Sequence, residues 1–139
     1  MNIDSIKNGY VIDHITAGRG MQIYKLLQLD KLDCSVAIIQ NAVSTKMGRK
    51  DIIKVDSVFD IDLDIIGFVD PGITVDVIRN GELAEKKNIA LPKKLVNVIR
   101  CKNPRCITSV EQELEQVFTL TDPETKTYRC LYCETKYDN

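Results

Sequence analysis

Four of the five cysteines in this chain of 139 residues lie in its last 39 positions, as two close pairs. Cys101 and Cys106 are separated by four residues, Cys130 and Cys133 by two, and 23 residues lie between the pairs. A tetrahedral zinc site takes four such soft ligands, and two tight turns that each present two thiolates commonly supply them. The spacing therefore favours one structural Zn²⁺ per chain, bound by these four cysteines.

The size of the cysteine-rich segment is a second reason to expect metal. Below about 40 residues a chain buries too little apolar surface to fold without a metal or disulfides. Structural zinc contributes roughly 10–16 kcal/mol in small peptide systems, which is of the order needed to offset a missing core. The segment has no histidine, so the site would be closed, with no position for a catalytic water. Two disulfides, or free buried cysteines, are the alternatives.

Composition indicates a globular chain that folds, since 44% of its residues are apolar and 28% are charged. No apolar run approaches the roughly 20 residues that a helix needs to cross a membrane. The first ten residues, MNIDSIKNGY, do not have the pattern of a secretory signal. We therefore expect no membrane association and a cytoplasmic location, where thiols stay reduced. Cys34 begins the apolar run CSVAII and is expected to be a small core residue.

Charge and motifs argue against two other classes of function. The formal net charge is −1, and the last 39 residues carry five basic and seven acidic side chains, so nucleic acid is not an expected partner. A zinc-ribbon module that binds nucleic acid or another protein remains the alternative. An enzyme is not expected, because the sequence offers no nucleophile with its base, no phosphate loop and no open metal site.

The first 90 or so residues alternate between strand and helix patterns. Apolar alternation predicts strands in YVIDHI (10–15) and KDIIKVDSV (50–58), and the strongly β-prone run CSVAIIQNAV (34–43) predicts another. An Asn-Gly turn predicts two more strands in ITVDVIRNGELAEKK (73–87). Helical spacing predicts helices in GMQIYKLLQL (20–29) and SVFDIDLDIIGFV (57–69). This βαββαβ order, with one extra strand, predicts an α+β fold: a ferredoxin-like antiparallel sheet with both helices on one face.

Pro92, in ALPKKL, interrupts these patterns and marks an expected domain boundary. The predicted domains are therefore 1–92 and 93–139. In the second domain the short alternating pieces VFTL (117–120), TYRC (127–130) and ETKY (134–137) are suited to a small sheet that carries the cysteine turns. We expect a zinc-bound β domain of the zinc-ribbon or rubredoxin-like kind.

Four segments together resemble one family. GYVIDHI, MGRKDIIKV, LPKKLVNVIRC and the C-x4-C…C-x2-C tail occur in the order found in the regulatory chain of aspartate carbamoyltransferase. The resemblance implies a non-catalytic subunit in pyrimidine biosynthesis. It implies an N-terminal allosteric domain that binds nucleotide effectors and forms a homodimer, and a zinc domain that docks on the catalytic chain. CTP and UTP would inhibit the enzyme, and ATP would activate it.

The same resemblance suggests which residues would contact an effector. Main-chain groups of residues 3–6, ending at Ile6, would contact the base, while Asp13 and His14 would reach the ribose and phosphates. Lys54 and Lys86 match lysines at the sugar and the triphosphate, and ammonium groups suit a strongly anionic ligand. Each of these side chains could instead be an ordinary solvated surface group.

Two positions depart from the family pattern. Asp76 stands where members often have asparagine, which puts a negative charge close to the expected nucleotide. Gly81 stands where they often have a bulky residue. These departures leave base selectivity open.

Overall fold

The computed structural model describes residues 6–137 and separates the chain into two compact units, which divide between Ala90 and Leu91. Each unit has its own antiparallel sheet. Within the described residues, no helix has the length and apolar character that crossing a membrane would require.

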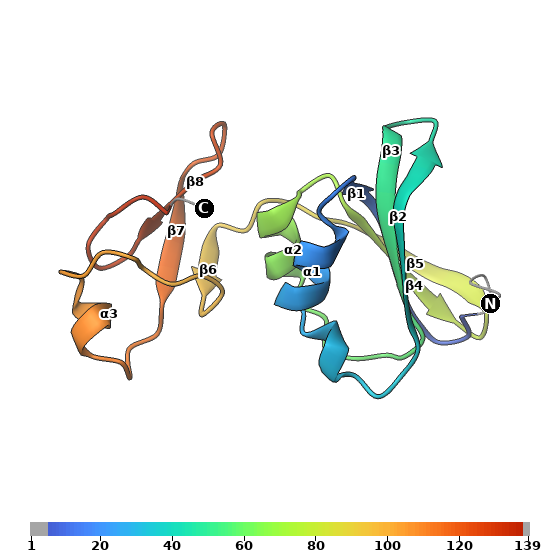
Figure 1. Cartoon of the computed structure of the whole chain (residues 1–139), viewed down its shortest axis with the longest axis horizontal. Helices are drawn as coiled ribbons and strands as arrows, with labels where there is room; N and C mark the ends of the chain where they lie inside the picture. Colours follow the sequence, from blue (N-terminus) through green and yellow to red (C-terminus); the bar gives the residue numbers. More distant parts are fainter. Residues whose placement is uncertain (1–5, 138–139) are drawn as a thin grey trace. The chain divides into compact units, whose positions relative to one another are not determined.

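The first unit is built on a five-stranded antiparallel sheet with two helices (Figure 1). Its elements in chain order are β1 (Gly9–Thr16), α1 (Gly20–Leu26), the 3-10 turn η1 (Leu29–Lys31), β2 (Val36–Ser44), β3 (Gly48–Val55), α2 (Leu63–Val69), β4 (Thr74–Arg79) and β5 (Glu82–Asn88). The strand order is β2-β3-β1-β4-β5. The first four strands have the ferredoxin-like order and β5 adds an edge, so the predicted fold class is confirmed.

One face of this sheet is covered by the helices and the other is open. Alternate strand residues such as Ile12, Ile53 and Val75 are fully buried and pack with Ile23 of α1 and Ile66 of α2. Cys34 is half-buried and packs against this core, as predicted. Because side chains alternate along a strand, the residues between the buried ones point to the other face. That open face carries the charged residues discussed below.

Both predicted helices are shorter than their apolar patterns. The second was predicted from residue 57 but begins at Leu63, because the Asp62 side chain accepts the backbone N–H groups of Asp64 and Ile65 and caps the helix there. Residues 57–62 are not helical; Phe59 instead packs edge-on against Tyr10, whose hydroxyl donates to the Phe59 carbonyl at 3.0 Å. The first helix ends at Leu26.

The second unit has a three-stranded sheet in the order β6-β7-β8. Its elements are β6 (Lys94–Val96), the single-turn helix α3 (Ile107–Val110), β7 (Val117–Asp122) and β8 (Thr127–Cys130). The strand predicted at 134–137 is wrong, since that segment makes only an isolated bridge from Lys136 to Arg129. The third strand is instead β6, where Leu95 is buried and pairs with Phe118.

Candidate functional site

The four cysteines of the second unit converge on one point. Their Sγ atoms all lie within 4.8 Å of one another. The distance is 3.6 Å between Cys101 and Cys133 and 3.7 Å between Cys106 and Cys130. Four sulfurs at tetrahedral Zn–S distances lie about 3.8 Å apart, whereas disulfide sulfurs lie about 2.05 Å apart. The donor set therefore fits one structural zinc ion and does not fit two disulfides.

Local hydrogen bonds make the two turns that present these sulfurs. In the first turn, the Asn103 side chain accepts from the Arg105 N–H at 3.0 Å and its carbonyl accepts from the Cys106 N–H at 3.0 Å. In the second, the Glu134 N–H donates to the Cys130 carbonyl at 2.9 Å, with Glu134 in the left-handed region at φ +64°. Both turns are thus formed by the residues between and beside the cysteines.

Polar groups outside the cysteines contact the cluster. The buried Thr108 hydroxyl donates to Cys106 Sγ at 3.1 Å, and Thr135 Oγ1 lies 3.2 Å from Cys133 Sγ. The Cys101 N–H donates to the Gln116 side chain at 2.9 Å. Contacts of this kind hold metal ligands in position. Sequence reasoning did not identify these three residues, because threonine and glutamine at such positions give no distinctive pattern.

The surroundings of Cys101 and Cys130 raise the pKa of both thiols. Burial, together with the neighbouring cysteine thiols, raises the pKa of Cys101 to about 12. A hydrogen bond with Thr135 lowers the pKa of Cys133 to about 6. A divalent cation would supply the positive charge that four thiolates need at neutral pH. All four positions of the tetrahedron are taken by sulfur, so zinc here would supply structure and no catalytic water.

A second group of polar residues crosses the open face of the first unit. In the strand register, Lys54 of β3 faces Val11 of β1, Val11 faces Asp76 of β4, and Asp76 faces Lys86 of β5. Residues that face each other across neighbouring strands point to the same side of a sheet. The fold therefore brings three of the sequence-predicted effector residues into one row.

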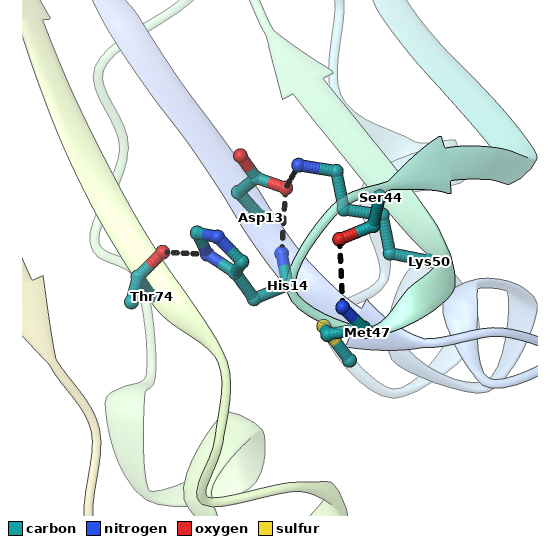
Figure 2. Close-up of polar contacts among 6 residues, drawn as sticks. All are labelled: Asp13, His14, Ser44, Met47, Lys50 and Thr74. Atoms are coloured by element: carbon teal, nitrogen blue, oxygen red, sulfur yellow. Dashed lines mark hydrogen bonds and ion pairs between the residues drawn. The ribbon is translucent and has the colours of Figure 1, made fainter.

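Asp13 and His14 lie in the neighbouring row of the same face, where Asp13 faces Thr74. Figure 2 shows the Asp13 carboxylate between two partners. The Lys50 ammonium lies 3.0 Å from Asp13 Oδ1, and the same oxygen accepts the His14 backbone N–H at 2.6 Å. His14 Nδ1 lies 2.9 Å from the Thr74 hydroxyl (Figure 2). Lys50 and Thr74 were missed by sequence reasoning, although Lys50 lies in the MGRKDIIKV segment.

His14 has an unusual backbone conformation. Its φ is +59°, and the register of β1 against β3 shifts between Ile12 and Ile15. A bulge of this kind redirects a side chain and is common beside functional sites. It directs consecutive residues, Asp13 and His14, toward groups on the two neighbouring strands.

These contacts keep Asp13 ionised. Burial would raise the pKa of the Asp13 carboxyl, but the hydrogen bond from Lys50 and the N–H and charge of His14 outweigh it and lower the pKa below 3.8. The carboxylate is therefore an acceptor at neutral pH, as a contact to ribose hydroxyls requires.

The segment before β1 lies beside the turn between β4 and β5. The Lys7 carbonyl accepts the Gly81 N–H at 2.9 Å, and the Asn8 side chain accepts the Asn80 N–H at 3.3 Å. Asn80 and Gly81 have φ of +53° and +79°, so the predicted Asn-Gly turn is confirmed. Ile6 is half-buried just before these residues. Residues 3–5 of the predicted base-contacting segment lie outside the described residues.

Two family models match this chain, one for each unit. The allosteric domain of the aspartate carbamoyltransferase regulatory chain matches residues 1–90. The metal binding domain of the aspartate carbamoyltransferase regulatory chain matches residues 93–139.

Individual relatives agree over nearly the whole length. An aspartate carbamoyltransferase regulatory chain of Clostridium botulinum is 53% identical over 137 residues, which cover 99% of this chain and 94% of the relative. The one from Clostridium tetani is 49% identical over 138 residues, covering 99% and 96%. The one from Bifidobacterium longum is 46% identical over 134 residues, covering 96% of each.

Proposed function

The chain belongs to the family of aspartate carbamoyltransferase regulatory chains, and from this membership we propose that it binds nucleotides on its first unit and transmits their effect to the catalytic chain. It has an allosteric domain and a metal-binding domain, and its partner is the catalytic chain. The observation that carries the proposal is that residues predicted to contact an effector lie on one open sheet face of the allosteric domain.

Residues in the two rows of this face would contact different parts of a nucleoside triphosphate. The Asp13 carboxylate would accept from ribose hydroxyls, and main-chain groups up to Ile6 would contact the base. The ammonium groups of Lys54 and Lys86 would neutralise phosphate oxygens, and the His14 ring would add a donor if Nε2 carries the proton. CTP and UTP as inhibitors and ATP as activator are the effectors that the family suggests.

The four cysteines would hold one zinc ion and so shape the surface that docks on the catalytic chain. Apolar side chains are exposed around the two metal turns: Ile107 is 51% exposed, Leu131 52% and Tyr132 41%. Ile107 directly follows Cys106, and the other two lie between Cys130 and Cys133. Exposed apolar groups gathered at one place are typical of protein interfaces. The metal would fix the loops that carry them.

Dimerisation through the first unit would use the edge strand β2. The two edges of the five-stranded sheet are β2 and β5. β5 (ELAEKKN) carries charged side chains, which protect an edge from pairing. β2 (VAIIQNAVS) carries none, and its Val43 is 75% exposed. The difference supports pairing of two copies along β2.

The chain would have no catalytic role and would lie in the cytoplasm. A closed thiolate site supports the first point. Four clustered cysteines that fit a metal better than disulfides support the second, since thiols stay reduced in the cytoplasm. An effector would change the enzyme only as far as it favours one quaternary state over another.

Calorimetric titration tests the effector site. CTP, UTP and ATP are titrated into the purified full-length chain, with and without the catalytic chain. We expect saturable binding of at least one nucleotide, with an affinity that changes on assembly because coupling is reciprocal. Failure of all three nucleotides to bind the assembled complex would refute the proposal. A gel shift with DNA or RNA at moderate salt tests the alternative of a nucleic-acid-binding zinc ribbon.

A further inference from the structure

The Asp76 carboxylate has an oxygen atom that accepts no hydrogen bond from the described residues. Asp76 Oδ1 is buried and has no hydrogen-bond partner within the part of the chain that the structure describes. A buried acceptor without a partner has lost its hydration without replacing it, so such atoms are rare and indicate a water, an ion or a ligand. The Asp76 carboxylate is therefore suited to binding a water, an ion or a ligand.

The neighbours of Asp76 indicate which part of a nucleotide would lie there. Lys86 faces Asp76 across the β4–β5 pair, and Cβ atoms of such pairs are about 4.5–5.5 Å apart. Lys54 lies in the same row beyond Val11. A phosphate group that contacts the Lys86 ammonium would therefore lie beside the Asp76 carboxylate.

A phosphate and a carboxylate cannot satisfy each other directly. Both offer only acceptor oxygens at neutral pH, and both are negatively charged, so they repel. A divalent cation between the phosphate and the carboxylate would accept oxygen ligands from both and would offset their charge repulsion. Mg²⁺ is a hard cation that proteins commonly bind through one or two carboxylates together with the phosphates of the ligand.

We propose that Asp76 makes the effector site select the magnesium complex of its nucleotide. Asp76 Oδ1 and phosphate oxygens bind one Mg²⁺, either directly or through a water of the ion, while Lys86 contacts the remaining phosphate charge. The inference rests on the proposed nucleotide site. An asparagine at this position could donate its amide N–H to a phosphate and would need no cation.

Calorimetry with and without magnesium tests this proposal. CTP is titrated into the full-length chain in buffer freed of divalent ions by a chelating resin, with no soluble chelator that could strip zinc, and then in the same buffer with millimolar MgCl₂. We expect the Kd of the unchanged chain to fall about tenfold when magnesium is added. The Asp76→Asn variant should bind CTP with the same Kd in both buffers.

A matched control removes the same charge from the opposite face. Glu85 lies beside Lys86 on β5 but faces Val77, which is buried under the helices. The Glu85→Gln variant should therefore keep the magnesium dependence of the unchanged chain.

The remaining outcomes separate this inference from the function it rests on. Equal Kd values in the two buffers for the unchanged chain would overturn the inference alone. So would weaker binding by Asp76→Asn in both buffers, because that result indicates that Asp76 accepts a nucleotide N–H or O–H. No binding of CTP, UTP or ATP by either protein in either buffer would overturn the nucleotide site, and the magnesium site with it.

Discussion

Asp51 Oδ2 accepts the backbone N–H of Gly20 at 2.9 Å, although 31 positions separate the two residues in the chain. The same oxygen accepts the Gly18 N–H at 3.0 Å, and Asp51 Oδ1 accepts the Asn41 N–H at 2.8 Å. Asp51 is fully buried in β3 and faces Ile15, at the end of the bulge that contains His14. One carboxylate on β3 thus connects that strand to the start of α1 and to the bulge of β2.

Replacing Asp51 by asparagine should destabilise the first unit. The amide NH₂ cannot accept an N–H, so at least one of the three donors would be left buried without a partner. Hydrogen bonds to a charged group contribute roughly 1.5–3 kcal/mol, so we expect a loss of about 2–4 kcal/mol, measured by urea unfolding. Asp60→Asn, at an exposed position, is the control and should unfold like the unchanged chain.

Gly20→Ala should also destabilise, against the usual trend. Alanine in a helix is ordinarily better than glycine by about 1 kcal/mol. Here an added Cβ would lie 2.9 Å from Asp51 Oδ2 and 3.1 Å from Asp51 Cβ. The Asp51 carboxylate cannot move away without losing its other hydrogen bonds. A higher urea midpoint for Gly20→Ala would show that the carboxylate is not held as firmly as the contacts indicate.

Lys86 and Lys87 provide a matched pair for the effector site. They are neighbours on β5, but Lys86 faces Asp76 on the open side, whereas Lys87 faces the buried Val75 on the helix side. Lys86→Gln should raise the Kd for CTP about tenfold through loss of one phosphate contact. Lys87→Gln should change it little. Equal effects in calorimetry would mean that only the overall charge matters.

Stability should fall in acid partly because of Asp70. Burial would raise the pKa of Asp70, but hydrogen bonds from the Thr16 hydroxyl and from the backbone N–H groups of Thr16 and Gly72 lower it below 3.8. A group whose pKa is lower in the folded state contributes stability above its unfolded pKa and loses it as the pH falls through the folded pKa. Asp70→Asn should therefore be less stable at neutral pH, with the difference shrinking below about pH 4.

The measurement for Asp70 is urea unfolding of the unchanged chain and of Asp70→Asn between neutral pH and pH 3. A stability difference that stays constant over this range would contradict the expected linkage, because it would mean that the Asp70 carboxyl does not change its proton affinity on folding.

Removing the zinc ligands should release the chain from its catalytic partner. Cys130→Ser takes one thiolate from the cluster, and structural zinc contributes roughly 10–16 kcal/mol to the folding of small domains. We expect the second unit to unfold and the assembly to dissociate in sedimentation, while the first unit keeps its circular dichroism signal. Cys34→Ser, at a half-buried position packed against the core of the first unit, should leave the assembly intact. Intact assembly by the Cys130→Ser variant would contradict the role given to the metal.

Local sequence was sufficient to predict the features that depend only on residues close together in the chain. The cysteine spacing predicted the cluster because each pair lies on one tight turn, formed by residues between and beside the two cysteines. The Asn80-Gly81 turn followed from the tolerance of both residues for positive φ. Alternating apolar residues placed the central strands, because alternation reports directly which face is buried. Apolar spacing could not place the start of α2, since the Asp62 cap decided it.

Contacts between distant segments were decided only by the tertiary structure. Lys50 and Asp13 meet because two strands pair with a bulge between them, and nothing in either local sequence specifies that pairing. β6 forms because Leu95 is buried beside Phe118. A run of three residues is too short to predict such a strand from its sequence. Asp51 and Asp76 look alike in the sequence, as single acidic residues within strands. The fold surrounds Asp51 with three backbone donors, whereas residues 6–137 offer no donor to one oxygen of Asp76, because strand register and burial determine what each carboxylate contacts.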